Sequence, residues 1–275
     1  MLRHASLVAG GILVLAVIIC AIFAPQLAPY SPYVGNLAYR LDPPTWMAGS
    51  SHLHFLGADE VGRDELSRII YGSRISLLVG FSATALACLI GTTLGMLAAY
   101  YGGFVETVVM RLVDLVLAFP FILLAIMIVA ILGPGLGKII FVLAVTQWAG
   151  FARIVRGETL SMKEREFVEA ARALGLRGVR IMLKHILPNI ASSIIVLFTI
   201  AVAVNILAES ALSYLGLGVS PQIPTWGGML AAGQLYITTS WWVATFPGIA
   251  IMLTVMGFNL VGDWLRDRID PKYRV

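Results

Sequence analysis

Long runs without charged residues dominate the chain, and they recur at lengths suited to crossing a membrane. A helix needs roughly 20 apolar residues to cross the hydrocarbon core of a bilayer. Six runs approach this length, and shorter polar stretches separate them. The pattern predicts an all-α membrane protein with six transmembrane helices, at approximately residues 7–23, 75–101, 115–132, 139–151, 190–207 and 242–261. The fourth run is short, and we expect its helix to continue towards Val155.

One polar stretch between the fourth and fifth runs differs from the rest of the chain. Residues 153–184 hold eight Lys/Arg and four acidic residues, so a helix there must lie in water. Ser161 and Glu164 fit a capping box at a helix start, and Gly175 suits a left-handed C-cap. Between them, one apolar face is predicted from the i, i+3, i+4, i+7 spacing of Phe167, Ala170, Ala171 and Leu174. Such a helix is free to bind a soluble partner; the alternative is a surface helix that only returns the chain to the membrane.

Composition and charge narrow the class of protein. Of the 275 residues 59% are hydrophobic and 12% are charged, about half the usual charged fraction. A soluble protein is therefore not expected. The net charge of +4 does not indicate nucleic-acid binding, because the basic residues lie beside the membrane runs. Cys20 and Cys88 both lie within apolar runs, which favours buried thiols over a disulfide or a metal site.

The distribution of Lys and Arg predicts how the chain is oriented. With the N-terminus inside, fourteen of the nineteen Lys/Arg residues lie on the cytoplasmic side and five lie outside. Both termini and residues 153–184 are then cytoplasmic, and the first run is an uncleaved span. We expect residues 1–74 to form an anchor helix, an extracytoplasmic loop and a pre-span helix. Residues 75–265 form a domain of five core helices, and residues 266–275 form a cytoplasmic tail.

The chemistry expected of an enzyme is thin. Residues 132–139 are a near match to a P-loop, but Leu132 replaces the first glycine and Ile139 replaces the magnesium-binding Ser/Thr. His52 and His54 are expected to form a solvent-exposed pair, because two ligands do not make a metal site. No nucleophile motif or paired carboxylates occur in the sequence. We therefore expect no enzyme and no cofactor bound by this chain.

Polar residues inside the spans are costly in lipid and tend to face a pathway or the bundle interior. Four of them are candidates for a substrate pathway: Gln147, Asn205, Glu209 and Asn259. For Glu209, the alternative is an interfacial acid that pairs with an amide or with a partner subunit.

Three stretches resemble one family. Glu169-Ala170-Ala171-x-x-x-Gly175, followed by Leu187-Pro188, resembles the EAA motif of permease subunits in bacterial binding-protein-dependent ABC importers. His185 departs from the general motif, which has an apolar residue there, but residues 185–189 resemble the peptide/nickel branch. Residues 56–77 and 209–227 are similar to the C-type subunit of that branch.

This resemblance implies a type I ABC importer permease fold with a cytoplasmic coupling helix, in the bacterial cytoplasmic membrane. The implied partners are a second, B-type permease subunit, two cytoplasmic ATPase subunits that bind ATP and Mg, an extracytoplasmic substrate-binding protein and membrane lipid, with no nucleic acid. The implied ATPase-docking residues are Glu166, Phe167, Glu169, Ala170, Ala171, Arg172, Leu174 and Gly175.

The implied substrates are di- or oligopeptides, while nickel, glutathione or a modified sugar stays open. A secondary transporter driven by an ion gradient is a rival, although such proteins usually have more spans or an inverted repeat. A structural membrane subunit of an enzyme complex is a third reading, which the lack of cofactor ligands disfavours.

Overall fold

The computed structural model describes residues 2–269, and these residues form helices joined by loops. No strand occurs in this part of the chain; its one isolated bridge joins Ala58 and Asp64. The helices are α1 (Leu2–Ile22), α2 (Ala24–Leu27), the 3₁₀ turn η1 (Leu37–Tyr39), α3 (Glu65–Tyr101), α4 (Gly103–Ala118), α5 (Phe121–Leu132), α6 (Leu136–Lys163), α7 (Glu166–Ala173), α8 (Gly178–Ile181), the π-helical turn η2 (Met182–Ile186), α9 (Leu187–Tyr214), α10 (Trp226–Gln234) and α11 (Trp242–Ile269).

Long apolar helices confirm the prediction of an all-α membrane protein. Four helices in the described residues are long and apolar enough to cross a membrane: α3, α6, α9 (with α8 and η2) and α11. The pair α4 and α5 adds a fifth span if both are counted together, and Leu7–Ile22 is a shorter apolar helix. Five of the six predicted runs correspond to single helices, and α6 continues past Val155 as expected.

The third predicted span has a different form. The prediction of a single helix over residues 115–132 is wrong, because the chain bends by 92° between α4 and α5. The break lies at Phe119, which is extended with φ −94° and ψ 139°. Pro120 follows it, and proline disfavours helical backbone at the residue before it and has no N–H of its own. The bend therefore has a local cause in the sequence.

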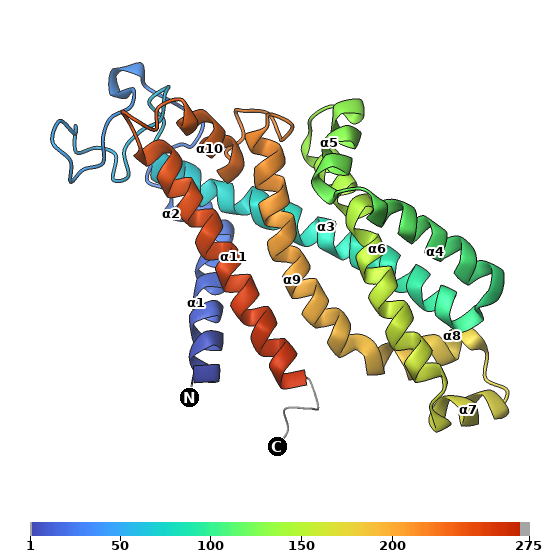
Figure 1. Cartoon of the computed structure of the whole chain (residues 1–275). Coiled ribbons are helices and arrows are strands. Elements are labelled where there is room, and N and C mark those ends of the chain that lie inside the picture. Colours follow the sequence, from blue (N-terminus) through green and yellow to red (C-terminus); the bar gives the residue numbers. More distant parts are fainter. Residues whose placement is uncertain (1, 270–275) are drawn as a thin grey trace.

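The elements expected in the cytoplasm lie at one end of the bundle (Figure 1). The start of α1, the end of α11 and α7 are at this end, and α10 and residues 28–64 are at the other. We call residues 28–64 the cap segment. The predicted boundary at residue 74 falls inside α3, so the expected pre-span helix and the second span are one continuous helix. Part of the predicted tail, residues 270–275, lies outside the described residues.

The bundle is held together by close packing of α3 against α6. A Cβ atom on Gly91 would lie 2.4 Å from the Trp148 carbonyl oxygen, and one on Gly95 would lie 2.4 Å from that of Ala152. Glycines four residues apart let two membrane helices approach backbone to backbone. This contact fixes α6, and with it the start of the polar stretch, on the long helix α3.

The connection into α9 is a π-helical turn. The backbone N–H of Leu187 donates to the Met182 carbonyl, an i to i−5 hydrogen bond. Pro188 follows immediately and has no N–H to give to the carbonyl four residues earlier. The wider turn lets the helix continue through the proline without a break.

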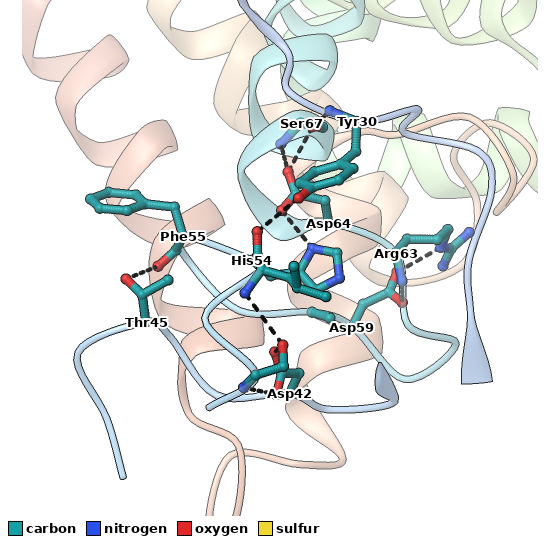
Figure 2. A network of polar contacts seen from close by, with 12 residues as sticks. Tyr30, Asp42, Thr45, His54, Phe55, Asp59, Arg63, Asp64 and Ser67 are labelled. Carbon is teal, nitrogen blue, oxygen red and sulfur yellow. Dashed lines mark hydrogen bonds and ion pairs between the residues drawn. The ribbon is translucent and has the colours of Figure 1, made fainter. Parts of the chain in front are cut away.

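The cap segment is tied to the start of α3 by buried polar contacts (Figure 2). Asp64 caps α3 by accepting from the Ser67 backbone N–H at 2.8 Å and from its hydroxyl at 2.6 Å. His54 Nδ1 lies 3.0 Å from Asp64 Oδ1. The prediction of an exposed histidine pair is therefore right for His52 and wrong for His54, which is buried against Asp64.

Candidate functional site

The short helix α7 contains the polar motif, and it starts later than predicted. The prediction of a capping box at Ser161 is wrong, because α6 continues to Lys163 and Ser161 lies within its last turns. Its backbone amide is not one of the orphan amides that a cap serves. The chain turns at Glu164, and Arg165 precedes α7 in an extended conformation without a side-chain cap.

The end of α7 confirms the C-cap predicted at Gly175. Gly175 has φ +74°, in the left-handed region that glycine adopts without steric cost. Its N–H donates to the Arg172 carbonyl at 3.0 Å, and the Leu176 N–H donates to the Ala171 carbonyl at 3.2 Å. This pair of hydrogen bonds is the Schellman arrangement. The glycine thus ends α7 sharply and redirects the chain towards α8.

The faces of α7 differ from the prediction of one apolar face. Ala171 is buried as part of that face, but its buried neighbour is Val168. Phe167 is exposed, and Leu174 is 82% exposed. Glu166, Glu169, Ala170 and Arg172 are also on the accessible side. The helix therefore presents both large apolar and charged side chains to solvent, a combination that suits a protein partner.

The buried face of α7 joins it to the spans. Val168 and Ala171 pack in a cluster with Met96 of α3, Val155 of α6 and Ile181 of α8; Met182, Ile186 and Ile190 complete it. Such interiors are close-packed and transmit displacement rather than absorb it. The cluster therefore joins α7 to α3, α6 and α9.

Polar contacts fasten the same region. Lys163 Nζ donates to the Ala99 carbonyl at 2.9 Å, and the Arg172 guanidinium lies over the Tyr100 ring, 5.8 Å from its centroid. A recess of about 420 Å³ lies between the end of α3 and α7, and Glu164 and Glu169 contribute to its wall. The recess carries charges of both signs, and Glu169 is exposed at its edge.

Three of the four candidate pathway residues lie on facing helices, and two are fully buried. Asn205 donates to the Thr84 hydroxyl at 2.8 Å and accepts from Gln147, which joins α9 to α3 and α6. Glu209 accepts from the hydroxyl groups of Ser213 at 2.7 Å and Ser76 at 3.4 Å. The structure thus shows a polar network between helices of one chain. The serine and threonine side chains of α3 were its missed signal in the sequence.

Asn259 lies apart from this network. It is exposed on α11 and lines an apolar groove between α9 and α11 together with Met252 and Asp263. The role of the four residues in a substrate pathway stays a prediction.

The network suggests a test that separates packing from substrate contact. We expect Asn205→Leu to lower the melting temperature of the purified complex, because Gln147 and Thr84 lose a buried partner, at a cost of about 1–3 kcal/mol. Asn259→Leu is the matched control, since Asn259 is exposed, and should leave the melting temperature unchanged. A selectivity change with Asn205→Leu at unchanged melting temperature would instead support a pathway role.

The fold and this site define a class: a polytopic helical membrane protein that presents a short amphipathic helix beyond its spans. In the described residues no cluster of His, Cys, Asp and Glu could hold a metal. Residues 91–275 match the family of binding-protein-dependent transport system inner membrane components. Residues 1–44 match the N-terminal transmembrane domain of oligopeptide transport permease C. The chain belongs to the family of binding-protein-dependent transport system inner membrane components, so it is a multi-pass inner-membrane permease and not itself an enzyme.

Relatives of known name agree over nearly the whole chain. The di/tripeptide transport system permease protein DppC of Pseudomonas aeruginosa is 42% identical over 96% of this chain and 88% of its own length. The dipeptide transport system permease protein DppC of Alkalihalophilus pseudofirmus is 44% identical over 97% of this chain and 86% of its own length. The glutathione transport system permease protein GsiD of Pectobacterium atrosepticum is 42% identical over 99% of this chain and 89% of its own length. The resemblance inferred from the motifs is confirmed.

Proposed function

We propose that this chain is the C-type permease subunit of an ATP-driven importer for short peptides. It forms half of the translocation pathway, and a second, B-type permease subunit forms the other half. Two cytoplasmic ATPase subunits bind ATP and Mg, and an extracytoplasmic substrate-binding protein supplies the substrate. The names of the relatives support peptides, with glutathione, itself a small peptide, as the nearest alternative. None of these three names mentions nickel or a sugar.

The observation that carries the proposal is the two-faced α7. Its exposed side offers Phe167, Glu169 and Leu174 to a partner, and its buried side is packed into the cluster that links three spans. A groove on the ATPase would hold the exposed side. Because the buried side cannot move independently of α3, α6 and α9, closure of the two ATPase subunits would rotate the spans from an inward-open to an outward-open arrangement.

The docking residues have distinct proposed roles. Glu169 and Arg172 make polar contacts at the edge of the charged recess, while Glu166, Phe167 and Leu174 extend the contact surface. Ala170 is exposed and small, which permits close approach of the partner. Ala171 and Gly175 act through the helix, by packing and by ending it.

The orientation supports the same arrangement. The start of α1, the end of α11 and α7 share one end of the bundle (Figure 1), and the Lys/Arg distribution favours the cytoplasm for this end. The cap segment and α10 would then meet the external binding protein.

The proposal predicts ATP-dependent uptake of peptide by the complete transporter. The test uses proteoliposomes with both permeases and both ATPases, and with the binding protein on the opposite side of the membrane from the ATPases. Radiolabelled dipeptide should accumulate only when ATP is present on the side of the membrane that carries the ATPase subunits. A complex that accumulates no di- or tripeptide, while its binding protein captures a different class of solute, would contradict the peptide assignment. Uptake driven by an ion gradient without ATP would contradict the importer class.

A further inference from the structure

Aromatic side chains of the cap segment gather beside the start of α11, at the end of the bundle opposite α7. The centroid of the Trp46 ring lies 5.5 Å from that of Phe55 and 6.2 Å from that of Phe246. The Trp241 and Phe246 rings are 5.7 Å apart. We call these four side chains, Trp46, Phe55, Trp241 and Phe246, the aromatic cluster. Neither the packing of the spans nor docking at α7 uses it.

The aromatic cluster is open to its surroundings. Trp46 is 55% exposed, Phe55 is 58% exposed and Trp241 is 39% exposed. Figure 2 shows the Phe55 ring pointing away from the buried polar contacts of His54 and Asp64. A single exposed apolar side chain is ordinary on a protein, whereas a group of large ones marks an interaction surface. The cluster is therefore a contact surface for something outside this chain.

The loop that carries Trp46 and Phe55 has no charged side chain of its own. Residues 43–58 contain no Asp, Glu, Lys or Arg. The Thr45 N–H donates to the Phe55 carbonyl at 3.3 Å and closes the loop. The Ser51 N–H and hydroxyl donate to the buried Asp42 carboxylate at 3.0 Å and 2.5 Å. The loop can therefore place its rings against an apolar medium without burying an unpaired charge.

The span in α11 sets the depth of the aromatic cluster in the membrane. Residues 242–262 carry no charge, and a helix of this length rises about 30 Å, the thickness of the hydrocarbon core. Charged residues begin at Asp263 and mark the far boundary of the core. Trp241 then lies at the near boundary, and Phe246 lies about one helical turn inside it. Because Trp46 contacts Phe246, this ring of the cap segment lies at the level of the boundary.

Buried contacts hold the cap segment at this depth. Trp242 is buried at the start of α11, and its Nε1 donates to the Ala58 carbonyl at 3.3 Å. Gly57 packs on the same ring, since a Cβ there would lie 2.8 Å from Trp242 Cδ1. The loop cannot move away from α11 without breaking these contacts.

The aromatic cluster also continues an outward face of α11. Exposed side chains follow Trp241 at intervals of three or four residues, at Thr245, Ile249, Met252 and Met256. This face carries no charge along the span, as expected of a surface that meets lipid, where charged side chains are rare. The cluster thus lies at the point where a lipid-facing surface reaches the end of the bundle.

We propose that the aromatic cluster anchors the cap segment in the membrane interface, with lipid headgroups and the first carbons of the acyl chains as its partner. Aromatic side chains with a polar N–H, such as Trp46, are enriched at this level because they offer both an apolar ring and a hydrogen-bond donor. The inference rests on the span in α11 and holds for any transported substrate. It leaves other exposed apolar side chains of the cap segment, such as Val34 and Leu37, for the binding protein.

The test measures which medium surrounds position 55. A nitroxide spin label is attached to Phe55→Cys in a chain whose native cysteines are replaced by Cys20→Ala and Cys88→Ala. The complete permease–ATPase complex is placed in nanodiscs without the binding protein. Collisions of the label are measured with oxygen, which concentrates in lipid, and with a nickel chelate, which stays in water. A lipid that carries the nitroxide on its headgroup provides the reference.

The ratio of oxygen to nickel collisions at position 55 should equal or exceed that of the headgroup-labelled lipid. A ratio several-fold lower would place the label in water and overturn the proposal. If the binding protein then protected the label, the surface would belong to that protein instead. Low collision rates with both reagents would also overturn the proposal, because another subunit would then cover the aromatic cluster.

Removal of the neighbouring ring tests the anchor itself. Trp46→Ser in the labelled chain should lower the collision ratio at position 55 several-fold, because the loop loses its largest interfacial side chain. Leu37→Ser is the matched control, since it removes an exposed apolar side chain of the same segment outside the aromatic cluster, and it should leave the ratio unchanged. A ratio that Trp46→Ser does not lower, or that both variants lower equally, would contradict the anchor.

A measurement without any label covers the case in which Phe55→Cys disturbs the loop. The tryptophan emission that is lost in Trp46→Phe, a conservative change, belongs to Trp46. This emission should be quenched by lipids brominated on the acyl chains and hardly changed by iodide in the buffer. Quenching of Trp46 by iodide and not by the brominated lipids would overturn the proposal, whatever the spin label reports.

Discussion

Glu169→Lys should abolish transport while the permease still inserts into the membrane. Glu169 is exposed at the edge of the charged recess beside α7, so lysine can be accommodated by the permease itself. In the docked complex the lysine would face a surface of the ATPase that binds the carboxylate of Glu169. Loss of one member of a desolvated charge pair costs about 2–5 kcal/mol, and charge reversal costs at least as much. The ATPase affinity should therefore fall by at least about thirtyfold.

The measurement combines co-purification of the ATPase subunits with peptide uptake in proteoliposomes. Asp267→Lys is the matched control, because Asp267 is an exposed acid near the end of α11, at the same end of the bundle as α7. This variant should keep both ATPase binding and peptide uptake. Ala170→Trp tests the same surface without a change of charge, because a large side chain would prevent close approach. Normal uptake and normal ATPase binding by Glu169→Lys and Ala170→Trp would show that α7 is not the docking site.

Gly95→Leu should prevent correct folding of the permease. A Cβ there would lie 2.4 Å from the Ala152 carbonyl oxygen and 3.0 Å from its Cα, so the new side chain meets backbone. Backbone of a packed helix cannot move aside as a flexible side chain can, and α3 and α6 would have to separate. Overpacking typically costs about 1–3 kcal/mol and occasionally more, and we expect about 3 kcal/mol or more here.

The expected result is aggregation after detergent extraction, or a melting temperature many degrees lower in the fraction that survives. Gly11→Leu provides the control, because a Cβ on this α1 glycine has no neighbour within 4 Å. The two substitutions add the same apolar side chain to a membrane helix and differ only in the space available. A stable, monodisperse Gly95→Leu protein would contradict the observed packing of α3 on α6.

The apolar runs alone were enough to predict most of the helices. Burial in lipid imposes one requirement on every residue of a span, so the runs at 75–101 and 242–261 mark α3 and α11 without knowledge of any neighbour. Gly175 could be predicted for a similar reason, because a left-handed C-cap depends on local backbone geometry. The Glu169-Ala170-Ala171 motif identified the family, and the comparisons agree with it. Pro120 also indicates the bend between α4 and α5, but the continuous apolar run led us to predict one straight span there.

Other features depended on contacts between distant residues. Ser161 fits a capping box by its spacing from Glu164. Because α6 packs on α3, it continues past Ser161, and the helix start predicted there does not form. Periodicity put Phe167 and Ala171 on one apolar face; only the position of Met96 and Ile181 decided that Val168 and Ala171 are buried and Phe167 is exposed.

Pairing partners were likewise beyond local reasoning. Asn205 is 121 residues from Thr84, and His54 is enclosed by Asp64 together with the rings of Tyr30 and Tyr39. Amino-acid type and spacing therefore determined which segments enter the membrane and where the chain turns, since these depend on transfer energies and local backbone geometry. Which side chains face one another was decided by the fold, because that depends on the three-dimensional arrangement of helices far apart in the chain.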